Sequence, residues 1–382
     1  MSYTVHCGTL RTGADISVLP ATGCTFGDEL KGVGSFSAAV GAGQCDDGVL
    51  WDATRGGVTF WAVEWSGDFG RQIVAAGPIF ARTGTDAGIT YGGSNLFGMM
   101  AHRRLINQGW TDAQISATWL AWYNLDLGSI MAAIVAMTCT TAPANLPIVY
   151  QAQRGGANTR TYNGYDMSDV ATAISALAAV EEGTAGLGGP DFVFEPRFKG
   201  GASAAVDFTR IEWVLRTGTA AAPSLTSATP LVLDRGAPGQ QDVGAVSVVE
   251  DAAALATRAF VTGAGTERAK VIASSVDPTL TNAGYPRMDV TRSTNALDYP
   301  TVKAQSAALL TAQKRTPSAT TVTVRADFWW ANGSGLGTTV RLIDPAHPVF
   351  GPVDLTSRVL KWSGDIASQW VTLTLADSLT EV

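Results

Sequence analysis

The chain has 382 residues, enough for two or three domains and a large buried core. Charged residues make up only 15% of it and the net charge is −7, so it lacks the basic surface that nucleic-acid binding requires. Two explanations of the low charge stay open. An assembly can cover much of the surface, or the genome's base composition can favour Ala, Gly and Arg.

The four cysteines form no C-x-x-C pair and no zinc-binding spacing, so they are expected to be free thiols: Cys7, Cys24, Cys45 and Cys139. Residues 1–6 lack the basic and apolar regions of a signal peptide, which predicts synthesis in a reducing cytoplasm. The longest apolar run, 127–139, is too short to span a bilayer and predicts a buried helix.

Residues 1–93 are predicted to form short strands broken by glycines. The run 58–65 is apolar on both faces, with Trp61 and Trp65 on one of them. An antiparallel strand at a free surface is polar on one side, so this strand is either enclosed or covered by a partner. Trp61 and Trp65 are therefore candidate interface residues, in a predicted N-terminal β-barrel.

Residues 94–218 are predicted to form an α+β region. Capping signals and apolar spacing indicate three helices, beginning at Ser94, Thr111 and Ser168. Alternating strands follow at 191–198 and 210–216.

Residues 219–382 begin with an Ala/Ser/Thr/Pro-rich linker and continue as a second β-barrel with a helical insertion at 300–315. Trp329 and Trp330 end the predicted strand 322–328 and are candidate interface residues. The tetrapeptide Trp-Ser-Gly-Asp occurs at 65–68 and 362–365, a weak sign that the two barrels are related. The predicted fold class is α+β, mostly β, with two small β-barrels around an α+β middle region.

No catalytic, cofactor-binding or metal-binding residues are predicted. His6, His102 and His347 fall in three different predicted domains, and no two have metal-ligand spacing. The nucleophile elbow, the dinucleotide fingerprint and the phosphate-binding loop of nucleotide hydrolases are missing from the sequence.

Paired carboxylates give the strongest alternative, a polysaccharide or peptidoglycan hydrolase, because glycoside hydrolysis needs only two of them about 5–9.5 Å apart. Glu195 and Glu212 lie on neighbouring predicted strands, and Glu181 and Glu182 end the preceding helix. Glu212 alternates with Arg210, however, which is typical of a solvated or ion-paired strand face. A third alternative is a receptor- or carbohydrate-binding protein that exposes Trp329 and Trp330.

The order of these segments resembles the minor tail proteins of actinobacterial siphophages, which are similar in plan to the baseplate hub proteins of contractile-tailed phages. Four stretches carry the resemblance: 61–79, 89–105, 168–198 and 319–375. The resemblance is one of pattern and order and includes no catalytic signature.

The resemblance implies a homotrimer at the virion tail tip, made in the host cytoplasm. Two barrels from each subunit would form a pseudo-sixfold ring between the tail tube, with its distal tail protein, and the other tail-tip proteins. The tape measure protein and then DNA would pass through its lumen without sequence-specific binding. The family implies no enzymatic activity and no cofactor.

Overall fold

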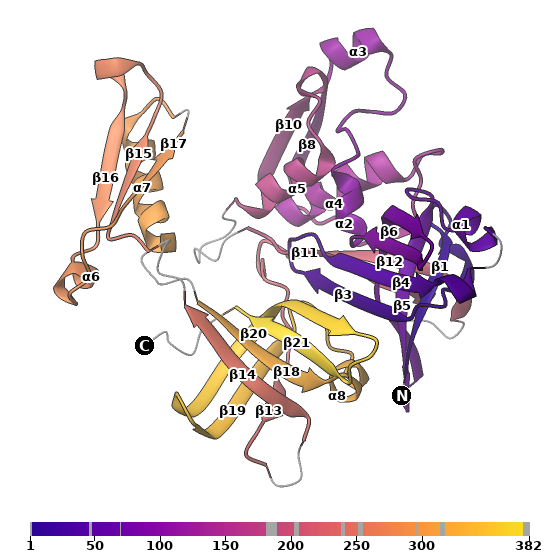
Figure 1. Ribbon diagram of the computed structural model, residues 1–382. Helices are drawn as coiled ribbons and strands as arrows, with labels where there is room; N and C mark the ends of the chain where they lie inside the picture. Colours follow the sequence, from indigo (N-terminus) through magenta and orange to yellow (C-terminus); the bar gives the residue numbers. More distant parts are fainter. Residues whose placement is uncertain are drawn as a thin grey trace. The chain divides into compact units, whose positions relative to one another are not determined.

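The computed structural model describes residues 2–376 except 46–47, 69, 181–188, 202–205, 238–240, 251–254, 295 and 314–317. The chain divides into two compact units (Figure 1). Unit 1 comprises Met1–Ala245 and Val322–Leu375, and unit 2 comprises Val246–Thr321 and Ala376–Val382. The predicted class, α+β and mostly β, is confirmed.

The N-terminal part of unit 1 is a run of antiparallel strands with one short helix, α1 (Val49–Ala53). The strands are β1 (Ser2–Thr9), β2 (Ala14–Val18), β3 (Gly23–Glu29), β4 (Ser35–Gly41), β5 (Thr59–Gly67), β6 (Gly70–Thr85) and β7 (Gly88–Gly93). Their order is β3-β4-β7-β6-β5-β1-β2.

Strand β5 has two apolar faces because the chain itself covers both. On one face Trp61 stacks on Phe36 of β4, with ring centroids 4.2 Å apart. On the other, Phe60 meets Trp213 edge to face at 6.1 Å. The strand is thus enclosed within unit 1, and no partner is needed to bury it.

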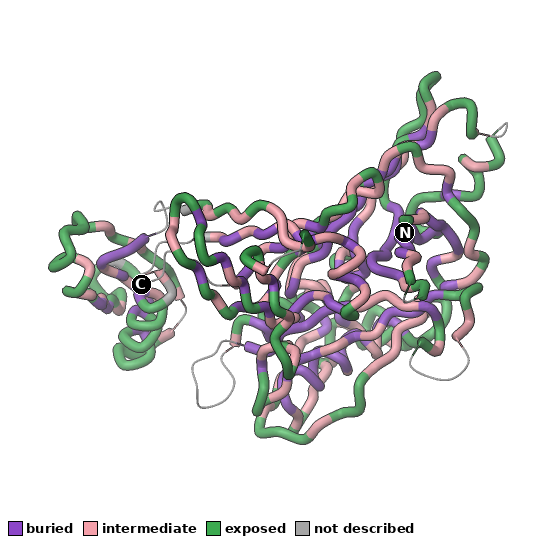
Figure 2. Tube along the Cα trace, turned by 90° about the horizontal axis from the view of Figure 1, so that it is seen from below, coloured by how far each residue is buried: buried purple, intermediate pink, exposed green. Residues whose placement is uncertain are grey.

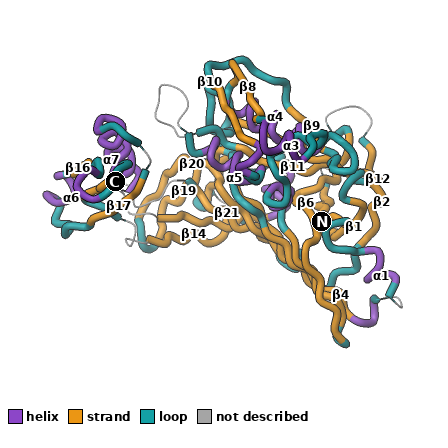
Figure 3. The backbone as a smooth tube through the Cα atoms, turned by 90° about the horizontal axis from the view of Figure 1, so that it is seen from above, coloured by secondary structure: helices purple, strands orange, loops and turns teal. Residues whose placement is uncertain are grey.

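The α+β region packs helices α2 (Leu96–Met100), α4 (Leu127–Cys139) and α5 (Val170–Ala178) around one apolar core (Figure 3). Its strands form a β8–β10 ribbon (Trp119–Leu125, Asn158–Asn163) and the sheet β11-β12-β9 (Phe192–Lys199, Asp207–Thr217, Ile148–Tyr150). The predicted buried helix 127–139 is confirmed as α4.

Two predicted helices here are shorter than expected. The helix expected to begin at Ser94 is α2, which is capped by Asn95 and ends at Met100. The helix opened by the Thr111 capping box, α3 (Asp112–Ala117), stops before Trp119. Trp119 and Trp122 lie instead on β8, because aromatic side chains favour strands and Trp122 packs edge to face on Tyr162 of β10.

The C-terminal strands of unit 1 continue the N-terminal sheet. They are β13 (Leu231–Asp234), β19 (Thr339–His347), β20 (Gly351–Asp365) and β21 (Trp370–Leu375), with the parts of β14 (Val243–Glu250) and β18 (Ser318–Arg325) that lie at 243–245 and 322–325. Strand β20 pairs with β3, which joins the strands into a 13-stranded sheet. Eleven of its strands run in order from β14 to β2, and β13 and β19 lie off this path. The two predicted separate barrels are therefore joined edge to edge, and no closed barrel occurs among the described strands.

The repeated tetrapeptide occupies similar places in this sheet. Residues 65–67 end β5, which pairs with β1 and β6, and residues 362–365 end β20, which pairs with β3 and β21. The relation between two barrels stays a prediction.

Unit 2 is a small α/β layer. Strands β16 (Ile272–Val276), β15 (Arg258–Thr262) and β17 (Asp289–Ser293) form one sheet, joined by the short helix α6 (Pro278–Asn282). Helix α7 (Tyr299–Gln313) packs on the sheet through Val302, against Val261 and Ala273. The helix predicted at 300–315 is present as α7, and its place as an insertion in a C-terminal barrel stays a prediction.

Helix α8 (Ala326–Ala331) contacts strands of both β regions of unit 1. Its Trp330 Nε1 donates to the Tyr3 hydroxyl of β1 at 2.8 Å, and its ring meets Trp362 of β20 edge to face at 5.1 Å. Gln72 of β6 donates to the Trp330 carbonyl at 2.9 Å. One buried indole therefore contacts strands that are distant in the sequence.

We expect Trp330→Ala to lower the free energy of unfolding by about 3–5 kcal/mol, because it opens a cavity and leaves Tyr3 without its donor. Trp330→Phe keeps most of the volume and should cost about 1–2 kcal/mol. Urea unfolding measures both. The control Trp119→Ala removes a side chain that is 60% exposed and should change stability by less than about 1 kcal/mol; an equal loss would contradict this role for Trp330.

Candidate functional site: buried ion pairs that join the regions of unit 1

Figure 2 shows that buried residues run through the interior of the chain. The four tryptophans predicted as interface residues are among the buried residues. Trp61, Trp65, Trp329 and Trp330 are 1%, 3%, 0% and 4% exposed. This burial counts against a contact role, because neighbouring side chains of the same chain already cover each indole. Trp329 and Trp330 also belong to α8 and not to a strand end, since β18 stops at Arg325.

The most exposed tryptophans are Trp51, Trp119 and Trp370. Trp119 and Trp370 sit in apolar periodic segments, where periodicity predicts burial, so the pattern does not reveal their exposure. Only the strand-end position of Trp370, just after the turn at 366–369, was a signal for exposure.

The candidate hydrolytic carboxylates are ion-paired across neighbouring strands. Arg197 of β11 lies opposite Glu212 of β12, and their side chains are 2.7 Å apart. Glu195 forms an ion pair with Arg216 on the same strand pair. The predicted ion-paired face is confirmed, and each carboxylate is held by an arginine. Glu181 and Glu182 lie outside the described residues.

The histidines and cysteines do not assemble a site in the described part of the chain. His6 hydrogen-bonds Glu64 at 2.9 Å, whereas His347 stacks on Phe350. The four cysteines are free, as predicted. Groups of three potential metal ligands do not occur among the described residues, nor does a helix long and apolar enough to cross a membrane.

Glu64 is the centre of one buried cluster. Its side chain accepts from Arg71 Nε at 2.6 Å and from Ser66 at 2.7 Å, besides contacting His6. Burial alone would raise the pKa of Glu64, but these hydrogen bonds and the arginine charge hold it below its usual value. Burial lowers the pKa of His6, although the Glu64 carboxylate opposes this. The cluster ties β1, β5 and the start of β6 together.

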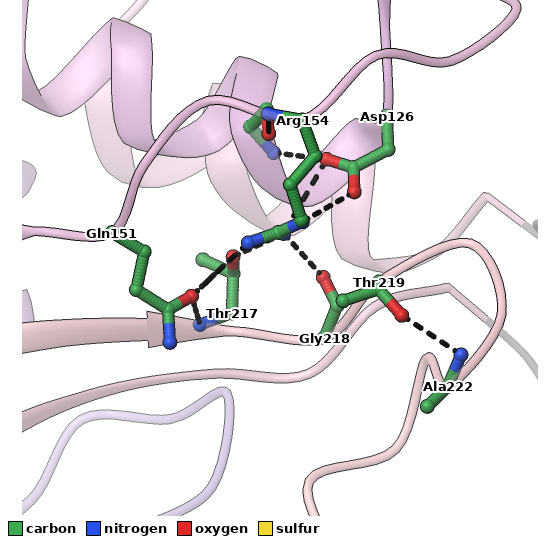
Figure 4. Close-up of polar contacts among 8 residues, drawn as sticks. Asp126, Gln151, Arg154, Thr217, Gly218, Thr219 and Ala222 are labelled. Carbon is green, nitrogen blue, oxygen red and sulfur yellow. Dashed lines mark hydrogen bonds and ion pairs between the residues drawn. The ribbon is translucent and has the colours of Figure 1, made fainter.

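Arg154 connects the N-terminus of helix α4 to the end of strand β12 (Figure 4). Its guanidinium donates to Asp126 Oδ2 at 2.6 Å, to Thr217 Oγ1 at 3.0 Å and to the Gly218 carbonyl at 3.0 Å. Gly128 permits this approach, since a Cβ there would lie 2.3 Å from the Gly218 oxygen.

Asp126 also caps helix α4. Its Oδ1 accepts from the Ser129 amide at 2.6 Å, and the Ser129 hydroxyl accepts from the Arg154 amide at 2.8 Å. Asp126 is 2% exposed, so its charge is stabilised by the helix N-terminus and by Arg154 together. The loop before β10, the helix and the end of β12 are thereby fixed to one another.

We expect Arg154→Ala to lower the free energy of unfolding by about 2–4 kcal/mol, because it leaves the buried Asp126 carboxylate without a cation. Arg154→Lys should lower the stability less than Arg154→Ala, since lysine keeps the positive charge but lacks the several planar N–H donors of the guanidinium group. Urea unfolding again provides the measurement. Arg160→Ala is the matched control, because that arginine bonds only the neighbouring Thr159 carbonyl; equal losses at both positions would contradict the assignment.

Asp191 joins segments from all three predicted domains. Its carboxylate, 1% exposed, pairs with Arg358 of β20 and lies 3.0 Å from Lys31 Nζ in the turn after β3. Its Oδ2 also accepts from the Leu225 amide in the linker at 2.9 Å. Two cations and one amide from distant parts of the sequence thus surround one buried acid.

Asp28 is another buried acid, and no cation forms an ion pair with it in the part of the chain that the structure describes. Its Oδ1 accepts from Asn95 Nδ2 at 2.6 Å and from the Glu29 amide at 2.9 Å. Burial, with a smaller contribution from the nearby Glu195 charge, raises its pKa to about 7. It lines a cavity of about 250 Å³ with Glu195, Arg216 and Trp362.

The raised pKa predicts a pH-dependent stability. The folded state retains the Asp28 proton up to about pH 7, whereas the unfolded chain releases it near 3.8, so stability should fall as pH rises between these values. Asp28→Asn keeps both accepted hydrogen bonds and removes the titration. The Asn variant should match the parent below pH 4 and exceed it by up to about 4 kcal/mol at pH 8.

Urea unfolding of both proteins from pH 4 to 8 isolates this effect, because other titrating groups cancel in the difference. A difference that stays constant with pH would contradict it.

Solved structures share this fold across nearly the whole chain. The tail protein from Neisseria meningitidis MC58 aligns over 99% of this chain and 97% of its own length, with a TM-score of 0.56 and 14% identity. The 43 kDa tail protein of prophage MuSo2 from Shewanella oneidensis aligns over 98% and 97%, with a TM-score of 0.55 and 12% identity. No protein-family model and no curated protein matches the sequence. The chain therefore has the fold of these two tail proteins.

Proposed function

We propose that this chain is a structural phage tail protein that forms a trimeric hub at the tail tip. The observation that carries the proposal is the fold match to two tail proteins over at least 97% of every chain concerned. The match includes the joined sheet, the α+β region and unit 2, so it covers the whole plan of the molecule.

The polar clusters support a structural role. Four buried acids each form an ion pair with an arginine from another segment: Asp126, Glu64, Glu212 and Asp191. Such ion pairs hold segments of the fold together. General acid–base catalysis instead needs a carboxyl group free to exchange its proton with a substrate. The hydrolase alternative therefore loses its candidates Glu195 and Glu212.

The expected partners are two further copies of the chain, the distal tail protein, the tape measure protein and other tail-tip proteins. The hub of an actinobacterial siphophage would pass DNA through its lumen without reading its sequence, and the net charge of −7 agrees with a surface that does not retain DNA. No enzymatic activity and no cofactor belong to this proposal.

Light scattering of the purified protein at several concentrations tests the trimer. We expect a mass near three times 39.7 kDa, or an equilibrium that shifts toward that mass as concentration rises. Antibody labelling of intact phage particles should then mark the tail tip. A monomer at every concentration, with label elsewhere on the particle, would overturn the proposal.

A further inference from the structure

An open groove crosses one face of the large sheet in unit 1. It has a volume of about 640 Å³ and is lined by residues of six neighbouring strands, β14, β18, β21, β20, β3 and β4. Most of the lining side chains are small. Larger side chains at these positions would fill the groove. The groove lies over the pairing of β3 with β20, to which its lining residues Thr25, Phe26 and Gly364 belong.

Two aromatic residues line this groove: Phe26, which is 2% exposed, and Trp370, the large exposed side chain. Trp370 is 39% exposed, and its ring lies against Gly244 of β14, where a Cβ would be 3.1 Å from the indole. The absence of a side chain at Gly244 therefore leaves room for the ring. An indole in this position presents apolar surface to the groove without being enclosed by the core.

Hydroxyl groups without a hydrogen-bond partner among the described residues also line the groove. Four lining side chains make no hydrogen bond within the described structure: Thr25, Ser35, Ser363 and Thr372. Asp365 adds a carboxylate, of which Oδ1 accepts from the Ala367 amide at 2.8 Å. Hydroxyls both donate and accept, and a carboxylate accepts only, so the groove offers mixed polar contacts beside one aromatic surface.

This chemistry selects among ligand classes. No lysine or arginine lines the groove, which disfavours nucleic acid and other phosphate-rich ligands. A single indole is too little apolar surface for a lipid or an apolar helix. A pyranose ring has one face of C–H groups, which packs on an indole, and a rim of hydroxyls that exchange hydrogen bonds with serine, threonine and aspartate.

We propose that this groove binds a neutral saccharide chain, with Trp370 as the stacking platform and the hydroxyls and Asp365 as hydrogen-bonding partners. The site goes beyond the hub function and does not rest on it. A groove that crosses several strands suits several consecutive sugar rings better than a single monosaccharide.

The test is titration calorimetry of the full-length protein with neutral hexasaccharides of glucose, galactose, mannose and N-acetylglucosamine. We expect at least one to bind with a dissociation constant of about 1 mM or lower. Trp370→Ala should weaken that binding about tenfold. Asp365→Asn should weaken it less, because the asparagine side-chain oxygen can still accept from the Ala367 backbone amide. Trp119→Ala is the control, an exposed tryptophan on another sheet, and should leave binding unchanged.

Circular dichroism and urea midpoints verify that each variant is folded. If Trp370→Ala does not fold, a double variant with Ser363→Ala and Thr372→Val replaces it. This variant should also weaken saccharide binding. The proposal is overturned if none of the four hexasaccharides binds, if the Trp370 variant binds as well as the parent, or if only a sulfated polysaccharide binds.

Discussion

The Asp191 ion pair is the interaction on which the arrangement of unit 1 depends. A carboxylate 1% exposed is tolerable only when cations and donors surround it, and removing one partner leaves a buried charge uncompensated. Those partners come from the turn after β3, the linker and β20. The buried carboxylate is therefore stable only when all three segments contact it. Folding of unit 1 is for this reason expected to be cooperative between the N-terminal and C-terminal parts of the chain.

The pairing of β3 with β20 has the same consequence for the backbone. Each of these strands would be a free edge if the two β regions were separate, and a free edge exposes unpaired amides and carbonyls. Their antiparallel register, from Lys361 opposite Glu29 to Asp365 opposite Thr25, satisfies those groups. Helix α8 then covers the joint with Trp330, so hydrogen bonding, packing and charge all fix one contact between the regions.

The sequence predicted local structure better than long-range contacts. Alternation and capping residues indicated the strands of residues 1–93, helix α7 and the Thr111 capping box, since these depend on neighbours in the chain. Alternation shows which strand face is buried but not which strand it pairs with, so the joining of β3 to β20 could not be predicted. Trp329 and Trp330 illustrate the same limit: their apolar character was evident, but their burial depends on β1 and β20.

The distribution of charge bears on why so few residues are charged. Many of the buried acids in unit 1 lie at joints between segments, as in Asp126–Arg154, Asp191–Arg358 and Asp344–Arg235. The groove along β3, β20 and β21 is instead lined mainly by small and hydroxyl side chains, with Asp365 as the carboxylate among them. A base-composition bias explains a small number of charges but not where they lie. The buried ion pairs lie where segments distant in the sequence meet, so part of the small complement of charge serves to hold unit 1 together.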